Sequence, residues 1–411
     1  ARAGGLGAAR GAGGEAPAVL AGVLARHNLG DLLFPHVAAA LLGDEPLHFA
    51  GLAARDLRSV GGHQVQSIAE MASRWGDRPA RLLHVGGETL SCGAWPAAVM
   101  LLPPEEVGPT VAYLEPRPTQ RAAWLRNMLG RETLAPYVLS RSDWPALRRI
   151  VHAGVGGVEL DRVDAAMGDA VLAKLRDADA LGVRDARTQA LLAHEGITAA
   201  LLPDPAVMVA ELFGARIRRR GEGGEAAAMR AAFPQGYLAV QFSTAFGDDA
   251  TLATIAAQLT QAIAATGLGV VLFRAGAAPW HDDLASLERV AQRLSATAVR
   301  VFRSLDIWDL CALIAGCAAC ASSSLHGRIV ATAFARPRLS LQPDDAQARI
   351  VKSDAFAQTW DEAAWPAAMP AQLADALDAA LAVDAAVLGL VAPRLVTAYR
   401  DGFARLRVAL D

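Results

Sequence analysis

Lysine is nearly absent from this chain of 411 residues, which contains only Lys174 and Lys352. Almost all of its positive charge is therefore carried by arginine, so recognition of a phosphate or carboxylate must rest mainly on guanidinium groups. Basic residues are not in excess either, because 39 Lys and Arg oppose 42 Asp and Glu and leave a formal charge of -3. We therefore expect no nucleic-acid partner, since nothing in the composition would neutralise a phosphodiester backbone.

Cysteine and long apolar runs are also scarce. The four cysteines, Cys92, Cys311, Cys317 and Cys320, do not form two CxxC pairs, so we interpret them as free thiols rather than as a zinc site or disulfides. The longest apolar run, residues 311–321, is much shorter than the roughly 18 residues of a membrane-spanning helix. No segment resembles a signal peptide, and a reducing, cytoplasmic environment is expected.

The composition is that of a globular protein, with 53% hydrophobic and 20% charged residues. The length is about twice that of a typical domain and favours two domains. Residues 1–15 are rich in Gly and Ala and are expected to be a flexible leader outside the fold. The segment 214–230, with an Arg cluster and several glycines, is predicted to be a linker between domains 16–213 and 231–411.

Short apolar runs alternate with amphipathic helical stretches in both domains. This pattern predicts an α/β fold in which parallel strands are buried on both faces. The runs are at 18–25, 47–52, 81–87, 149–157, 178–184 and 198–203, and again at 236–243, 269–276, 298–305, 317–324 and 338–343. We expect two doubly wound, Rossmann-like domains facing across a cleft, with terminal helices from about residue 369 closing over them. Ligands should bind at the carboxyl ends of the strands.

Polar residues and glycines follow three strands of the first domain. They are Asn28, Gly30 and Asp31 after the first strand, Gly86, Gly87 and Glu88 after the third, and Arg184 after the fifth. The first two loops are either capped, close-packed turns or ligand-binding loops. A cation at the end of a buried strand must be paired or hold an anion, which favours Arg184 as a binding residue. Asp185 and Asp204 are interpreted as structural residues, a helix cap and part of a turn.

The strongest local signal is in the second domain, where Ser322, Ser323 and Ser324 end a strand and His326 and Arg328 open the next helix. A helix N-terminus with hydroxyl groups favours an anion, and a histidine there can move a proton near neutral pH. Arg274 ends another strand of this domain. The motifs of P-loop NTPases, zinc hydrolases and EF-hands are absent from the sequence.

Taken in order, the motifs NLGD, HVGGETL, VRD followed by LPDP, and SSLHGRIVATAF resemble the polysaccharide pyruvyl transferase family, from about Ala18 to Lys352. Two positions depart from the family pattern. Ser324 stands where many members have arginine, for which Arg328 is the candidate substitute, and Gly86 and Gly87 stand where the family has a glycine triplet. The resemblance implies a fold similar to GT-B glycosyltransferases and transfer of the enolpyruvyl unit of phosphoenolpyruvate to a sugar, with formation of a pyruvate ketal.

The residues can be given roles on this basis. His326 is the predicted principal acid/base, Asp31 or Glu88 orients or deprotonates the acceptor, and no metal or cofactor is required. Phosphoenolpyruvate and the acceptor are expected to be bound by Asn28, Gly30, Gly86, Gly87, Arg184, Arg274, Ser322, Ser323, Ser324, Arg328 and Lys352. A lipid-linked acceptor would bring the protein to the inner face of the membrane. The alternatives are a GT-B glycosyltransferase that uses a nucleotide sugar, and a catalytically silent binding protein of the same fold.

Overall fold

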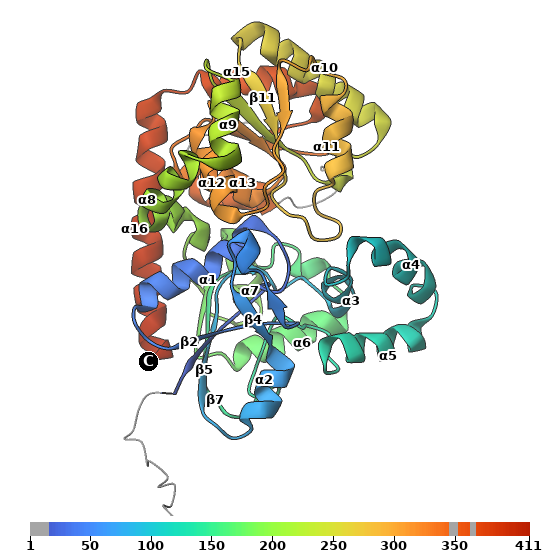
Figure 1. Cartoon of the computed structure of the whole chain (residues 1–411). Helices are drawn as coiled ribbons and strands as arrows, with labels where there is room; N and C mark the ends of the chain where they lie inside the picture. Colours follow the sequence, from blue (N-terminus) through green and yellow to red (C-terminus); the bar gives the residue numbers. More distant parts are fainter. Residues whose placement is uncertain (1–15, 345–351, 362–366) are drawn as a thin grey trace, which may run out of the picture.

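Two largely parallel sheets, each covered by helices, make up the structure (Figure 1). The computed structural model describes residues 16–344, 352–361 and 367–411, so the predicted leader 1–15 lies outside the described residues. The α/β architecture with a cleft between two Rossmann-like halves is confirmed. Each of the eleven apolar runs overlaps a strand.

The first sheet has nine strands within the described residues, and only the short β3 pairs antiparallel, with β4. Its strand order is β3-β4-β2-β1-β5-β7-β8-β9, with β6 beside β7. The strands are β1 (Ala18–Ala21), β2 (Leu47–Gly51), β3 (Arg55–Asp56), β4 (Gln64–Ser67), β5 (Ala80–His84), β6 (Gly87–Glu88), β7 (Leu147–Gly156), β8 (Ala180–Val183) and β9 (Ala200–Leu201). Sequence patterning missed β3, β4 and β6 because they are short and polar.

The second sheet is parallel throughout the described residues, in the order β12-β11-β10-β13-β14-β15. Its strands are β10 (Tyr237–Gln241), β11 (Gly269–Leu272), β12 (Val299–Val301), β13 (Ala319–Ser322), β14 (Arg338–Leu341) and β15 (Ala367–Ala368). In both sheets the chain builds outward on one side of the first strand and then crosses to the other side. These crossing points lie between β1 and β5 and between β10 and β13, and such points are where open α/β sheets bind ligands.

The helices of the first half are α1 (Leu29–Leu42), α2 (Ile68–Trp75), α3 (Ala94–Val99), α4 (Pro104–Leu114), α5 (Pro118–Leu129), α6 (Ala165–Arg176) and α7 (Ala186–His194). Those of the second half are α8 (Val209–Gly221), α9 (Gly224–Ala232), α10 (Asp249–Thr266), α11 (Leu284–Ala291), α12 (Ile307–Gly316), α13 (Leu325–Ala333), α14 (Lys352–Trp360), α15 (Leu373–Leu381) and α16 (Ala385–Leu410). The segment predicted to be a linker is helical, because α8 and α9 cover most of it and bury Ile217 and Met229 in the core.

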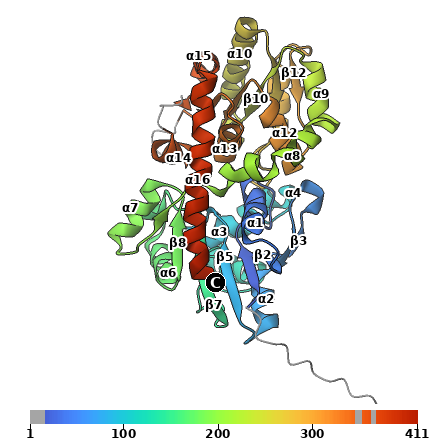
Figure 2. The same ribbon diagram turned by 90° about the vertical axis from the view of Figure 1, so that its left-hand side faces the viewer.

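The two halves share one apolar core. Phe34 of α1, Trp308 of α12 and Ile329 of α13 belong to the same buried cluster, so the halves are packed together on this side. The long α16 runs along both halves and contacts β7 and β8 of the first sheet as well as α13 (Figure 2). This agrees with the prediction that terminal helices close over the domains. A large apolar interface of this kind opposes independent domain motion.

Two further predictions concern the cysteines and membrane spans. The four cysteines are free thiols; three are buried, and Cys92 is half-buried beside the cleft. Within the described residues no single helix is long and apolar enough to cross a membrane. Residues 370–381 and α16 meet that measure only jointly, as a pair bent by 91°.

Candidate functional site

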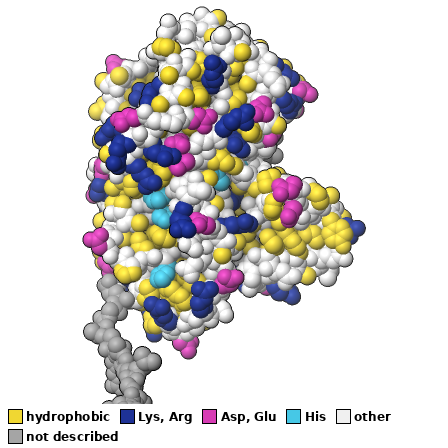
Figure 3. Space-filling model, viewed as in Figure 1, with side chains coloured by type: hydrophobic (Ala, Val, Ile, Leu, Met, Phe, Trp, Pro, Cys, Tyr) yellow, Lys and Arg dark blue, Asp and Glu magenta, His cyan; other side chains and the backbone are white. Residues whose placement is uncertain are grey.

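A pocket of ≈ 390 Å³ lies between the two halves, at the crossing points of both sheets. Figure 3 shows the surface hollowed between the second half and the lobe formed by α3, α4 and α5. The lining comes from the segments after β1, β5, β8, β10, β11 and β13, with Lys352 added by α14. It includes Arg26, Asn28, Asp31, Glu88, Arg184, Gln241, Ser243, Ser323, Ser324, His326 and Lys352. The prediction that strand ends from both domains meet is therefore confirmed.

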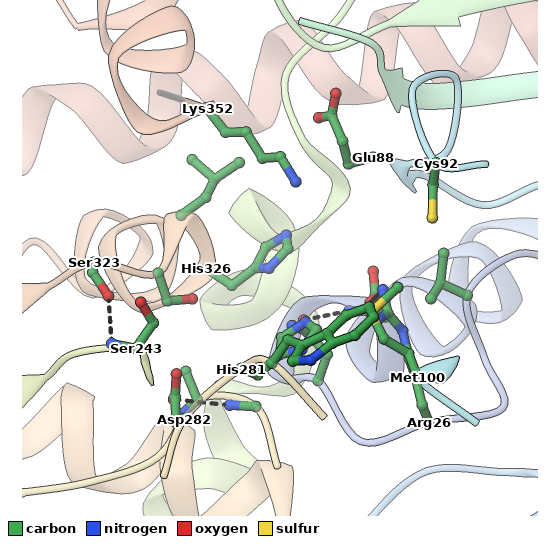
Figure 4. Close-up of a pocket in the computed structure, with 18 of the residues that line it drawn as sticks. Arg26, Glu88, Cys92, Met100, Ser243, His281, Asp282, Ser323, His326 and Lys352 are labelled. Atoms are coloured by element: carbon green, nitrogen blue, oxygen red, sulfur yellow. Dashed lines mark hydrogen bonds and ion pairs between the residues drawn. The ribbon is translucent and has the colours of Figure 1, made fainter. Parts of the chain in front are cut away.

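The loop before α13 is held in place by one glutamine. Gln241 ends β10, and its Oε1 accepts hydrogen bonds from Ser322 Oγ at 2.6 Å and from the Ser324 backbone N–H at 2.9 Å. Ser323 Oγ accepts from the backbone N–H of Ser243 at 3.0 Å (Figure 4), and Ser324 Oγ caps α13 by accepting from the Gly327 N–H at 3.4 Å. Ser323 and Ser324 line the pocket, whereas Ser322 is buried beneath it and positions the loop.

His326 projects from the first turn of α13 into a cradle made by the first half of the chain. The residue is 8% exposed and lines the pocket, and its ring meets Phe34 edge-on with 5.3 Å between centroids. A Cβ placed on Gly30 would lie 2.2 Å from the imidazole, so only glycine leaves room for the ring. The predicted contact of Gly30 with substrate is thus replaced by a contact with His326.

A chain of charges connects His326 to the opposite wall. Arg184 Nη1 donates to Asp204 Oδ2 at 2.9 Å, and Nη2 donates to Glu88 Oε2 at 2.6 Å. Asp204 Oδ2 also lies 3.5 Å from Nε2 of His326. Burial lowers the pKa of Arg184, but Glu88, Asp204 and Asp185 outweigh it and raise the pKa, so Arg184 is charged. The anion that Arg184 was expected to hold is therefore a pair of the protein's own carboxylates.

Asp31 and Glu88 are the two predicted carboxylates on the first-half wall. Burial raises the pKa of Asp31, while Arg26, with Nη2 at 3.8 Å, and His326 oppose the rise. Burial also acts to raise the pKa of Glu88, but Lys352 and Arg184 lower it below its usual value. Glu88 is thus an ionised, fixed group, and Asp31 is the carboxyl that can exchange a proton more readily.

The glycine pair after β5 serves backbone geometry. Gly86 and Gly87 have φ of 116° and 94°, in the region that favours glycine. A Cβ on Gly86 would lie 3.1 Å from Pro205, and one on Gly87 would lie 3.2 Å from Asp31 Oδ1. Neither glycine lines the pocket. Because the two glycines have no side chains, this turn can approach Pro205 and Asp31 closely. Asn28 caps α1 through Oδ1, accepting from the Gly30 N–H at 3.2 Å, and also lines the pocket.

Two predicted arginines do not face the pocket. Arg328 is 1% exposed and is directed into the second half, where Nη1 donates to Ser340 at 3.0 Å and Nη2 to Asp361 at 2.6 Å. Two residues beyond His326, it lies on another side of α13, so it does not replace the family arginine at position 324. Arg274 follows β11 but is likewise not among the pocket residues.

Sequence reasoning missed Arg26 and Asp282 in the pocket wall. Asp282 Oδ1 accepts from Gln241 Nε2 at 2.8 Å, and Oδ2 accepts from the backbone N–H groups of Ala275 and Gly276 at 2.6 and 3.1 Å. Burial raises its pKa to about 7 despite these bonds. Arg26 directly follows the first apolar run, which was a usable signal, whereas Asp282 lies in a loop distant from any strand end.

The chain resembles known proteins in both sequence and fold. The sequence pattern of the polysaccharide pyruvyl transferase family matches residues 153–345. No curated protein sequence matches the chain significantly. Two solved structures share the fold: MnaA of S. aureus, in a co-structure with UDP, and HepE of Anabaena, in complex with UDP-glucose.

MnaA is 14% identical with a TM-score of 0.53, and the match covers 96% of this chain and 95% of MnaA. HepE is 11% identical with a TM-score of 0.51, and the match covers 96% of this chain and 98% of HepE. At this identity the likeness supports the GT-B fold and nothing about ligands. Residues 153–345 thus match the family that the sequence motifs resemble, and this match indicates a transferase.

Proposed function

We propose that this protein transfers the enolpyruvyl unit of phosphoenolpyruvate to two hydroxyl groups of a sugar, in a polysaccharide or glycan precursor, to form a pyruvate ketal. The observation that carries the proposal is that two kinds of wall line one pocket of ≈ 390 Å³. The start of α13, His326 and Lys352 form a wall that favours anions, which we call the anion-binding wall, and Asp31 and Glu88 form a carboxylate wall. Figure 4 shows Lys352 and His326 pointing into the pocket, with Glu88 at its opposite side.

The anion-binding wall suits phosphoenolpyruvate, which carries a phosphate and a carboxylate. The N-terminus of α13 has a positive partial charge, and the hydroxyl groups of Ser323 and Ser324 add hydrogen-bonding capacity. Lys352 and Arg26 supply charge from two other directions. We assign the donor to this wall and omit Arg328 and Arg274 from its contacts.

The carboxylate wall suits the sugar, whose hydroxyl groups must be oriented and deprotonated. Asp31 is the better candidate for accepting a proton, because Glu88 is already fixed by Arg184, by Ser91 Oγ at 3.0 Å and by the Val158 N–H at 2.9 Å. We therefore assign Glu88 to orientation and His326 to the principal acid/base role.

The reaction balances with these protein groups alone. Protonation of the methylene carbon makes the adjacent carbon electrophilic, and one sugar oxygen bonds to that carbon as its hydroxyl proton leaves to a protein base. The bond from the same carbon to the phosphate oxygen breaks, and the second sugar oxygen replaces it. One pyruvate ketal and one inorganic phosphate result, and the two hydroxyl protons balance the protonated methyl group and the released phosphate.

The test is calorimetric titration of phosphoenolpyruvate, UDP and UDP-glucose into the wild type and Lys352→Met. The proposal is supported if Lys352→Met folds like the wild type but binds phosphoenolpyruvate more weakly, and if the wild type releases phosphate when sugar acceptors are added. His326→Ala should then reduce turnover by about 10²- to 10⁴-fold. Arg78→Met removes a cation that is not among the pocket residues and serves as the control. Binding of UDP compounds without phosphoenolpyruvate would replace the proposal with a nucleotide-sugar glycosyltransferase.

The location follows from the proposed donor rather than from the fold. Phosphoenolpyruvate is a cytoplasmic metabolite, so we propose that the protein acts in the cytoplasm, at the inner membrane face where the acceptor is lipid-linked. Cell fractionation with the acceptor glycan present and absent tests this placement.

A further inference from the structure

Asp204 makes more contacts than its role in a turn requires. It follows β9, its carboxyl is 0% exposed, and its Oδ1 caps the short 3-10 helix Pro205–Met208 by accepting from the Ala206 N–H at 3.0 Å. Capping uses only Oδ1. The second oxygen, Oδ2, lies between Arg184 Nη1 at 2.9 Å and His326 Nε2 at 3.5 Å.

This second oxygen connects the two halves of the molecule at His326. His326 belongs to α13 beside the second sheet, whereas Asp204 follows the last strand of the first sheet. Nε2 is buried and makes no hydrogen bond within the part of the chain that the structure describes, and the carboxylate oxygen Oδ2 of Asp204 lies 3.5 Å from it. Because Nε2 faces inward, Nδ1 is the ring nitrogen left for a substrate in the pocket.

Burial by itself would neutralise Asp204 by raising its pKa. His326, Arg184 and the Ala206 N–H outweigh burial and lower the pKa, so the carboxylate remains charged at neutral pH. A charged oxygen beside Nε2 favours the tautomer with the proton on Nε2, because that N–H points toward the carboxylate.

We propose that Asp204 is the positioning residue of His326, fixing its proton on Nε2 and leaving Nδ1 free to exchange a proton with substrate. Arg184 extends this arrangement, because it shares the same Asp204 oxygen and joins it to Glu88 on the acceptor wall. Orientation of the histidine and of the acceptor carboxylate thus depends on one buried arginine. The inference rests on the proposed role of His326 in pyruvyl transfer, and its first test does not use that reaction.

The first test is a nitrogen NMR spectrum of the wild-type protein labelled with ¹⁵N-histidine, in which the His326 signals are identified by their loss in His326→Gln. The expected result is that the neutral form of the ring carries its proton on Nε2. A ring protonated on Nδ1 would overturn the proposal even if phosphoenolpyruvate is the substrate. Conversely, a protein that ignores phosphoenolpyruvate but shows the Nε2 tautomer contradicts the proposed function and leaves the Asp204–His326 arrangement intact.

The second test compares Asp204→Asn with Asp185→Asn. Asp185 is also a buried cap that follows a strand, accepting from the Thr188 N–H at 2.7 Å, and asparagine preserves the capping oxygen in both variants. Asp204→Asn should disturb the His326 tautomer and lower kcat by about 10²-fold or more, with the Kd for phosphoenolpyruvate unchanged. Asp185→Asn should retain both properties. Equal kcat values in the two variants would refute the positioning role, and if Asp204→Asn does not fold, the wild-type spectrum decides.

Discussion

Gly30→Ala should displace His326, because the ring lies directly on the backbone of α1 at this glycine. The new Cβ would lie 2.2 Å from the imidazole, and ordinary contact begins at 3.4 Å, so the ring must retreat by about 1.2 Å. It has little room, since Phe34 packs against it with 5.3 Å between centroids and Asp204 lies 3.5 Å from Nε2. The substitution therefore forces a change in the packing between the two halves.

The change in the free energy of unfolding follows from two opposing effects of Gly30→Ala. Alanine is better than glycine in a helix by about 0.5–1 kcal/mol, whereas overpacking a tight core costs about 1–3 kcal/mol. We expect Gly30→Ala to lower the free energy of unfolding by about 1–2 kcal/mol. A shift of about 1 Å in a catalytic group costs on the order of 10²-fold in rate, so turnover in the proposed pyruvyl transfer should fall by that factor.

Gly389→Ala is the matched control for this prediction. Gly389 also lies inside a helix, α16, and a Cβ there would meet no atom within 4 Å. This variant should be stabilised by about 0.5–1 kcal/mol and retain its activity. Urea unfolding at pH 7 and a turnover assay measure both effects. If Gly30→Ala were as stable and active as Gly389→Ala, the close contact between Gly30 and His326 would be refuted.

Three other changes test the electrostatics. Arg184→Met leaves the buried Asp204 carboxylate without its cation, and urea unfolding should show a loss of about 3–5 kcal/mol; wild-type stability would contradict the ion-pair chain. The pKa of Asp282 is raised to about 7, so its contribution to stability falls as pH rises from about 4 to 7. Relative to Asp282→Asn, the wild type should lose about 1.4 kcal/mol per pH unit there, and a constant difference would refute this. Burial lowers the pKa of His152, stacked 4.0 Å from His84, to about 3. Relative to His152→Leu, the wild type should therefore lose about 1.4 kcal/mol per pH unit as pH drops from about 6.5 toward 3, and a constant difference between the two would exclude this site.

Much of the fold could be predicted because parallel strands that are buried on both faces consist of short, nearly continuous apolar runs. Apolar runs that end in Gly, Ser or Asn mark strand ends, and parallel topology brings such ends to one edge. This is why Asp31, Glu88 and His326, far apart in sequence, meet at one pocket. The helical nature of 214–230 was missed, because its few apolar side chains pack against a core that only the second half completes.

The amino-acid sequence by itself determined the two α/β halves, the strand ends that carry polar groups, and the anion-favouring start of α13. It could not determine the direction of a side chain, which depends on neighbours brought together only on folding. Arg328 and His326 are two residues apart, yet the helix directs His326 into the pocket and Arg328 into a buried pair with Asp361. Tertiary structure likewise decided that Gly30 makes room for a histidine. It also decided that Arg184 binds two carboxylates, because a buried charge is stable only when it is paired.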